Sequence, residues 1–170
     1  MNVSIEVARR MIDGDEKAFE EVCFAYRRLV FYVCLGYMGE REDAEDAFQD
    51  CFACLWANRG RIESAKALHS YIVRLARSRC LDALRKKHEQ LGLEADLIPS
   101  FDPKRLDYLL PNSLSPEQKA VISLRIGFGL KYKEVGEALG LSESYAKKKC
   151  LEALRQAKKA YSDNVRCQVM

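Results

Sequence analysis

The 170-residue sequence lacks a long hydrophobic run, and it contains only four prolines, two histidines and one tryptophan. No stretch approaches the roughly 20 consecutive apolar residues that a membrane-spanning helix needs, so we expect no direct membrane insertion. The first twenty residues are already charged and helical in pattern, unlike a secretory leader. Seven cysteines, an odd set without a leader, indicate reduced thiols in a cytoplasmic protein.

Two of the cysteines, Cys51 and Cys54, form a CxxC pair, which raises the question of a metal or redox site. The pair lies inside an amphipathic segment whose apolar residues include Phe48, Phe52 and Leu55, and no second pair follows at metal-ligand spacing. We therefore interpret both thiols as core packing, and we predict neither a metal ion nor a cofactor.

Net charge is only +3, but the charges are strongly segregated along the chain. Residues 40–50 hold six acids and one base, residues 74–88 hold six bases and one acid, and residues 144–159 again hold six bases and one acid. Faces of opposite sign predict more than one kind of partner.

Hydrophobic periodicity predicts an all-α protein. The pattern predicts helices at residues 5–12, 42–57, 67–89, 116–126 and 132–139. A longer helix is expected to begin at Asp15 and to end at Gly36 and Gly39, and the last helix is expected to begin at Ser142. Periodicity weakens and prolines recur between residues 90 and 112, where only one short helix is expected, at 104–110. We predict two small helical domains, residues 1–89 and 113–170, joined by a flexible linker, residues 90–112.

The helix predicted at residues 67–89 has one apolar and one cationic side. The apolar side gathers Leu68, Tyr71, Ile72, Leu75, Ala76 and Ala83. The opposite side gathers Ser70, Arg74, Arg77, Ser78 and Arg85. Arginines that follow one edge of a helix over nearly three turns are suited to an extended polyanion.

The helix that precedes it is acidic on its outer face. Its inward positions are Ala44, Ala47, Phe48, Cys51, Phe52 and Leu55. Its outward positions include Asp43, Asp46, Gln49 and Asp50. A carboxylate stripe favours a basic protein partner and excludes DNA as its ligand.

The second domain has the pattern of a helix-turn-helix. It begins at Ser115-Pro116-Glu117, a capping serine with proline in the first helical position. In its third helix the positions expected to face the core are Ala146, Cys150, Ala153, Leu154, Ala157 and Tyr161. The opposite face offers hydroxyl and basic groups suited to phosphates and base edges.

In this order of elements the chain resembles a bacterial RNA polymerase sigma factor of the small extracytoplasmic-function (ECF) group of the sigma-70 family. Three stretches carry the resemblance: DAEDAFQDCFACLW from Asp43, SYIVRLARSRCLDALRKKHE from Ser70, and LSPEQKAVISLRIGFGLKYKEVGEALGLSESYAKKK from Leu114. The resemblance implies sigma region 2 in the first domain and sigma region 4 in the second. The expected function is promoter recognition and opening as a subunit of RNA polymerase, which supplies the catalysis.

The resemblance also implies roles for individual residues. Core polymerase would bind Asp46, Gln49 and Asp50, with Asp43 at the margin. The downstream promoter element would contact Arg59, Arg61, His69 and Ser70 around a flipped base, and Arg74, Arg77, Ser78 and Arg85 along the backbone. The upstream element would contact Ser144, Tyr145, Lys147, Lys148, Lys149 and Glu152. Linker acids Glu94, Asp96 and Asp102 would mimic nucleic acid, and an anti-sigma factor would be a further partner.

Four positions depart from the family pattern: Tyr71, Ser78, Tyr145 and Glu152. The last two lie on the reading helix, so they affect the upstream sequence preference. They also leave open a divergent paralogue that binds polymerase but opens promoters poorly.

Two other classes of function remain as alternatives. A free-standing helix-turn-helix regulator explains both basic helices but not the acidic face. A magnesium-dependent nucleotide pyrophosphohydrolase would use the ExxED residues Glu42, Glu45 and Asp46, but it needs a second acidic pair on a facing helix, and the neighbouring helix is basic.

Overall fold

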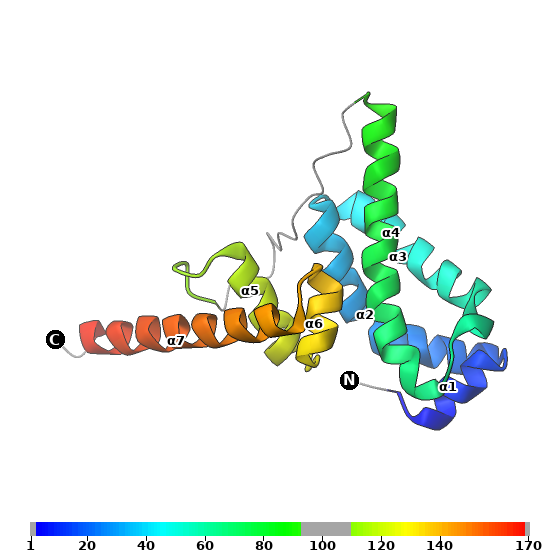
Figure 1. Ribbon diagram of the computed structural model, residues 1–170, viewed down its shortest axis with the longest axis horizontal. Helices are drawn as coiled ribbons and strands as arrows, with labels where there is room; N and C mark the ends of the chain where they lie inside the picture. Colours follow the sequence, from blue (N-terminus) through cyan, green and yellow to red (C-terminus); the bar gives the residue numbers. More distant parts are fainter. Residues whose placement is uncertain (1–2, 93–109, 169–170) are drawn as a thin grey trace. The chain divides into compact units, whose positions relative to one another are not determined.

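The computed structural model describes residues 3–92 and 110–168, with side chains as far as residue 160, and every regular element in this part is helical. The chain divides into two compact units, residues 1–100 and 101–170 (Figure 1). The all-α prediction is therefore confirmed, whereas the predicted boundaries at residues 89 and 113 stay a prediction. The helix expected at residues 104–110, except for Leu110, and the linker acids Glu94, Asp96 and Asp102 lie outside the described residues.

The first unit opens with two helices whose N-termini are capped by side chains. Ser4 Oγ accepts from the Val7 amide at 3.2 Å and caps α1 (Ile5–Ile12), while Asp15 caps α2 (Glu16–Met38). Gly39, in the left-handed region at φ 75°, ends α2. The expectation that Gly36 belongs to the helix end is wrong, because it lies buried within α2.

Helices α2, α3 (Arg41–Ala57) and α4 (Leu68–Gln90) pack against one another and enclose the core of the first unit (Figure 1). Two short 3₁₀ turns, η1 (Arg59–Arg61) and η2 (Ala65–Ala67), occupy the polar loop between α3 and α4. Of the apolar side predicted for α4, Leu68, Ile72 and Ala76 are fully buried, whereas Tyr71, Leu75 and Ala83 are only half-buried. Phe48 of α3, predicted to face inward, is only half-buried.

The second unit contains α5 (Pro116–Ile122), a π-helical turn η4 (Ser123–Gly127), α6 (Tyr132–Leu139) and α7 (Glu143–Gln168). Ser115 caps α5, as predicted, and it forms a capping box with Gln118. The α-helix that was expected to reach Ile126 ends at Ile122 and continues as η4. Gly140, with φ 72°, ends α6, and Ser142 Oγ accepts from the Tyr145 amide at 3.2 Å at the start of α7.

The buried side of α7 is narrower than its sequence predicts. Ala146, Cys150, Ala153 and Ala157 are buried, but Leu154 is 40% exposed and does not belong to the core. The buried positions are small side chains at spacings of four, three and four, which is a single narrow stripe of the helix. The side chain of Tyr161, also predicted to face the core, lies outside the described part.

Candidate nucleic-acid interface and acidic face

The four outward residues predicted for polymerase binding lie on one side of α3. Asp46, Gln49 and Asp50 are exposed, and Asp43 is half-exposed. Asp43 also lies in the first turn of α3, where the positive end of the helix dipole favours a carboxylate. The predicted acidic face is therefore present as an exposed surface.

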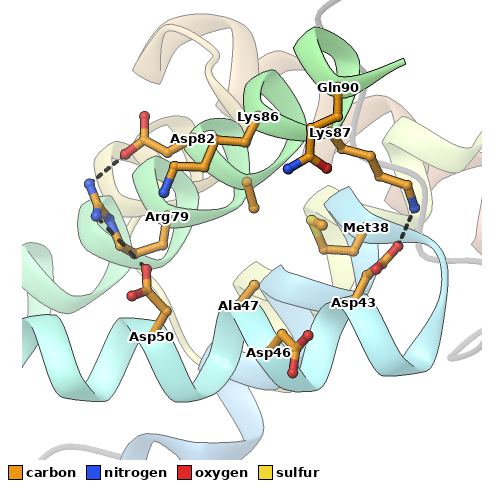
Figure 2. A pocket seen from close by; sticks show the side chains of 11 residues that line it. Met38, Asp43, Asp46, Ala47, Asp50, Arg79, Asp82, Lys86, Lys87 and Gln90 are labelled. Carbon is orange, nitrogen blue, oxygen red and sulfur yellow. Dashed lines mark hydrogen bonds and ion pairs between the residues drawn. The ribbon is translucent and has the colours of Figure 1, made fainter.

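Two of these carboxylates are bound by bases of α4 across an open cleft of about 450 Å³ (Figure 2). Lys87 Nζ lies 2.7 Å from Asp43 Oδ2, and Arg79 Nη1 lies 3.8 Å from Asp50 Oδ2. The hydrogen bond that Lys87 donates to Asp43, and then the charge of Asp43, raise the pKa of Lys87. Asp46 lies between the two pairs and directs its carboxylate away from α4, leaving it available to an external cation.

The six bases of α4 thus form two sets rather than one. Arg79, Lys86 and Lys87 line the cleft toward α3. Arg74, Arg77 and Arg85 share the other side of the helix, because their spacings of three and eight keep them within about 80° of one another. The sequence gives the angle of each base around the helix and so contains the division into two sets. It does not show that Arg79 and Lys87 pair with carboxylates of α3.

On the predicted DNA-binding side of α4, a buried tyrosine orients one of the arginines. Arg77 Nε donates to the hydroxyl of Tyr37, at 3.2 Å, and the rest of the guanidinium keeps its donors for other ligands. Burial raises the pKa of Tyr37, so the hydroxyl stays neutral and can accept. Arg74, Ser78 and Arg85 are exposed on the same stripe, and Arg85 also pairs with Asp82 at 3.3 Å.

The four residues predicted to surround a flipped base differ in how firmly they are held. His69 Nδ1 and the buried Tyr26 hydroxyl are hydrogen-bonded at 3.1 Å. Ser70, the residue after His69, is half-buried. Arg59 stacks over the Trp56 ring at 4.2 Å and donates to the Trp56 carbonyl at 2.8 Å, whereas Arg61 is exposed. Arg59 therefore also fastens the loop to the end of α3, a role that the sequence alone does not indicate.

In the second unit the predicted upstream-element residues gather at the first turns of α7. Ser144, Tyr145, Lys147 and Lys148 are exposed, whereas Lys149 and Glu152 are half-buried. Lys149 Nζ lies 5.3 Å from the centroid of the Tyr145 ring and 3.9 Å from Glu152 Oε2. The hydrogen bond to Tyr145 is the main cause that raises the pKa of Lys149. Tyr145 and Glu152, the two positions of this helix that depart from the family pattern, therefore both lie against the same lysine.

Helix α6 is held close to the start of α7 by a glycine that cannot be enlarged. A Cβ at Gly136 would lie 2.5 Å from the carbonyl oxygen of Leu141, and the Leu141 amide donates to the Gly136 carbonyl at 2.8 Å. This contact fixes the short connection between the two helices of the helix-turn-helix.

The geometry gives no support to the enzymatic alternative. Glu45 pairs with Arg41 at 2.7 Å, and α4 faces Asp46 across the cleft with three bases and a single acid, Asp82, which pairs with Arg79. Within residues 3–92 and 110–168, no group of three or more potential metal ligands is found. The CxxC pair belongs to the packing of α3, where Cys51 is buried and burial raises the pKa of its thiol. The described helices include none long and apolar enough to cross a membrane.

Family comparisons match both units. The profile of sigma-70 region 2 matches residues 25–90, and that of sigma-70 region 4 matches residues 112–159. The ECF RNA polymerase sigma factor SigW of Bacillus subtilis is 23% identical over 120 residues, which are 71% of this chain and 64% of SigW. The ECF RNA polymerase sigma factor SigM of Mycobacterium tuberculosis is 26% identical over 156 residues, which are 87% of this chain and 79% of SigM. The match thus spans less than two thirds of the length of SigW.

A solved structure shares the fold. CnrH, determined in complex with the cytosolic domain of CnrY, superimposes with a TM-score of 0.59 at 16% identity, covering 92% of this chain and 96% of CnrH. At this identity the likeness concerns the fold, and it extends over both helical units.

Proposed function

The chain belongs to the ECF group of the sigma-70 family of RNA polymerase sigma factors, and on this premise we propose that it binds core RNA polymerase and directs promoter recognition, promoter opening and transcription initiation. The proposal assigns no catalytic residue to the chain, since polymerase supplies the chemistry. It also implies that the protein acts in the cytoplasm, where both polymerase and DNA are found.

The observation that carries the proposal is the pairing of an exposed acidic face on α3 with an arginine stripe on α4 within one helical unit. Carboxylates at Asp46 and Asp50 repel DNA but suit a basic protein surface. Arg74, Arg77 and Arg85 suit phosphates. A free-standing regulator needs the second surface but has no use for the first.

Opening would follow from selective binding of the melted strand. Ligand binding shifts an equilibrium only by its difference in affinity between two states, so contacts made with unstacked bases favour open over closed DNA. We assign these contacts to the loop and the start of α4, where His69 is held by Tyr26, and we assign the backbone of the same strand to Arg77, which is held by Tyr37. The first turns of α7 would read the upstream element in the major groove.

The experiment that tests the proposal measures binding of the purified chain to bacterial core RNA polymerase at moderate salt. The double variant Asp46→Lys/Asp50→Lys should abolish submicromolar binding. The matched control is Glu16→Lys/Glu20→Lys, which makes the same charge change at the same spacing on exposed positions of α2. Equal binding by both variants, or DNA binding without polymerase binding by the unchanged chain, would contradict the proposal and favour a free-standing regulator.

CnrH is described in a complex with a domain of another protein. We propose by analogy that this chain, too, is held by an anti-sigma factor. Co-purification alone would not establish this; the test is whether a candidate partner prevents the chain from joining core polymerase.

A further inference from the structure

Arg59 ties the polar loop between α3 and α4 to two other parts of the first unit. Its Nη1 donates to the carbonyl of Trp56 at 2.8 Å, and its guanidinium carbon lies 4.2 Å from the centroid of the Trp56 ring. The Trp56 carbonyl belongs to the last turn of α3, where carbonyls lack partners within the helix and the helix dipole favours a cation. Arg59 therefore closes the end of α3 and fixes the beginning of the loop with the same group.

The second attachment of Arg59 is the turn between α1 and α2. A Cβ placed on Gly14, in this turn, would lie 3.5 Å from Nη2 and 3.6 Å from Nε of Arg59, so the guanidinium lies next to the backbone of the turn. The turn is itself well held, because the amides of Gly14 and Asp15 donate to carbonyls of α1 at 3.1 and 2.9 Å and Arg10 pairs with Asp15 at 2.6 Å. Helix α1 also contacts both 3₁₀ turns of the loop.

The Trp56 ring, on which Arg59 stacks, is fixed by α2. The centroids of the Phe19 and Trp56 rings are 4.8 Å apart, with the ring planes tilted by 43°. Asn58 adds a second side-chain bond at the end of α3, from its Nδ2 to the Cys54 carbonyl at 3.0 Å. The turn after α1, the first part of α2 and the end of α3 therefore meet around Trp56 and Arg59.

The loop has little else to keep it in one conformation. Within residues 58–67 only Ile62 is buried, and the two regular pieces, η1 and η2, are 3₁₀ turns of three residues each. Segments with few buried contacts open locally at low free-energy cost, and ordering them costs conformational entropy. A loop that is ordered before its ligand arrives avoids that cost on binding.

Arg61 belongs to the same turn η1 and differs from Arg59 in its surroundings. It is exposed, and among the described residues no hydrogen bond or ion pair of its side chain is found. Its guanidinium is therefore available to a phosphate or a base edge. Arg59 is half-buried, and its guanidinium is already engaged by the Trp56 ring, the Trp56 carbonyl and the Gly14 turn. Two arginines of one turn thus have different tasks.

We propose that Arg59 is a positioning residue: held between Trp56 and the Gly14 turn, it fixes the loop in the conformation that receives the melted strand, and it does not itself bind DNA. This changes the role that the sequence predicts for Arg59. It also makes Gly14, Phe19 and Trp56, all outside the loop, determinants of downstream-element recognition. The identity of the ligand rests on the proposed function; the anchoring of the loop by Arg59 does not.

The first measurement is hydrogen exchange of the full chain without polymerase. The amide of Ile62 donates to the Arg59 carbonyl at 3.1 Å, so its exchange reports the order of η1. Arg59→Met should speed this exchange about tenfold or more, while buried amides in the middle of α2 stay within about twofold. Arg61→Met, which removes the same charge from the same turn, is the matched control and should change the Ile62 amide less than about twofold.

The second measurement tests the role in DNA binding. A random-sequence single-stranded DNA library is selected on core polymerase carrying the unchanged chain, and the enriched oligonucleotide is the probe. Arg59→Met and Arg59→Lys should both weaken its binding about three- to tenfold with an unchanged log–log salt slope, because lysine keeps the charge but not the planar group that stacks and caps. Both variants should also discriminate less between the enriched and a random oligonucleotide, which a loss of global stability would not cause.

A salt slope lowered by about 0.7, together with rescue by lysine, would make Arg59 a phosphate contact and overturn the proposal. Unchanged exchange at Ile62 in Arg59→Met would overturn the anchoring of the loop. Exchange that rises equally throughout α2 would make Arg59 a general stabilising residue and overturn its positioning role. If polymerase carrying the unchanged chain enriches no oligonucleotide, the proposed function fails and the role in recognition with it, whereas the exchange of the free chain still decides whether Arg59 orders the loop.

Discussion

Lys87 of α4 binds Asp43 of α3, with 2.7 Å between Nζ and Oδ2, so a base of the cationic helix neutralises the margin of the acidic face (Figure 2). A polymerase that needs this carboxylate must compete with Lys87 for it. We therefore expect Lys87→Met to strengthen binding to core polymerase by about two- to fivefold, the range typical of exposed ion pairs.

The control for this prediction is Lys86→Met. Lys86 lines the same cleft and carries the same charge, but no ion pair is found for it among the described residues. Long-range effects of losing one positive charge are shared by the two variants, so a difference between them reports the pairing. The difference should shrink as salt rises, because screening shortens the reach of exposed charges. Equal affinities at low salt would mean that Lys87 does not compete.

Tyr37 is expected to act by positioning Arg77. The change Tyr37→Phe removes only the hydroxyl that accepts from Arg77 Nε at 3.2 Å. Losing one hydrogen bond of about 1 kcal/mol should weaken binding of promoter DNA by polymerase carrying this chain about three- to tenfold. The measurement is open-complex formation on a fixed promoter, with the melting temperature recorded alongside.

Tyr32→Phe is the matched control, because it removes a buried hydroxyl elsewhere on the same helix. A purely structural effect would lower the melting temperature without a selective loss of promoter opening. Combining Tyr37→Phe with Arg77→Met should cost no more opening than Arg77→Met alone. Additive losses would show that Tyr37 acts through another residue.

The helices and the charged faces could be predicted from the sequence, because caps and periodicity are local. Ser115 and Pro116 mark the start of α5, and the spacing of Asp46 and Asp50 places both on one outward side. Periodicity gives the angle of a side chain but not how far the neighbouring helix covers it. For that reason Phe48 was expected to be fully buried.

The partners of individual side chains could not be predicted, because they depend on how helices pack. Arg79 and Lys87 differ from Arg77 only by helical angle, yet they face carboxylates of α3 while Arg77 meets Tyr37. Tyr26 and Tyr37 look like ordinary core residues in the sequence. Their hydroxyls acquire a role only because α4 crosses α2 at His69 and Arg77.

Gly136 should be essential to the stability of the second unit. In Gly136→Ala the new Cβ would lie 2.5 Å from the Leu141 carbonyl oxygen, so α6 and the start of α7 must separate. Overpacking of this kind costs about 1–3 kcal/mol. Gly127→Ala is the control, since its Cβ would meet nothing within 4 Å. Denaturant unfolding should show a clear loss for the first variant and little change for the second; equal midpoints would contradict the tight contact.

Asp15 should make the stability of the first unit depend on pH. The hydrogen bond from Arg10, followed by that from the Ala18 amide, lowers the pKa of this carboxyl in the folded protein. A folded pKa below the unfolded value gives stability that is present above the unfolded pKa, near 4, and is lost as pH falls through the folded pKa. Asp15→Asn keeps a good N-cap but removes the charge. The two proteins should differ in unfolding midpoint at pH 7 and converge near pH 2; a constant difference would exclude this carboxyl as the cause.

Lys149 links the two unusual residues of the reading helix, and this link gives a prediction for upstream-element binding. Its ammonium lies 3.9 Å from Glu152, which holds it back from phosphate. Glu152→Gln should therefore release Lys149, strengthen binding to promoter DNA uniformly across sequences, and steepen the log–log salt dependence by about one phosphate contact, roughly 0.9 in slope. In a Lys149→Met background the same change should leave the slope unaltered. A change in sequence preference without a change in slope would instead assign Glu152 to a base edge, and Lys149 would then have no part in its effect.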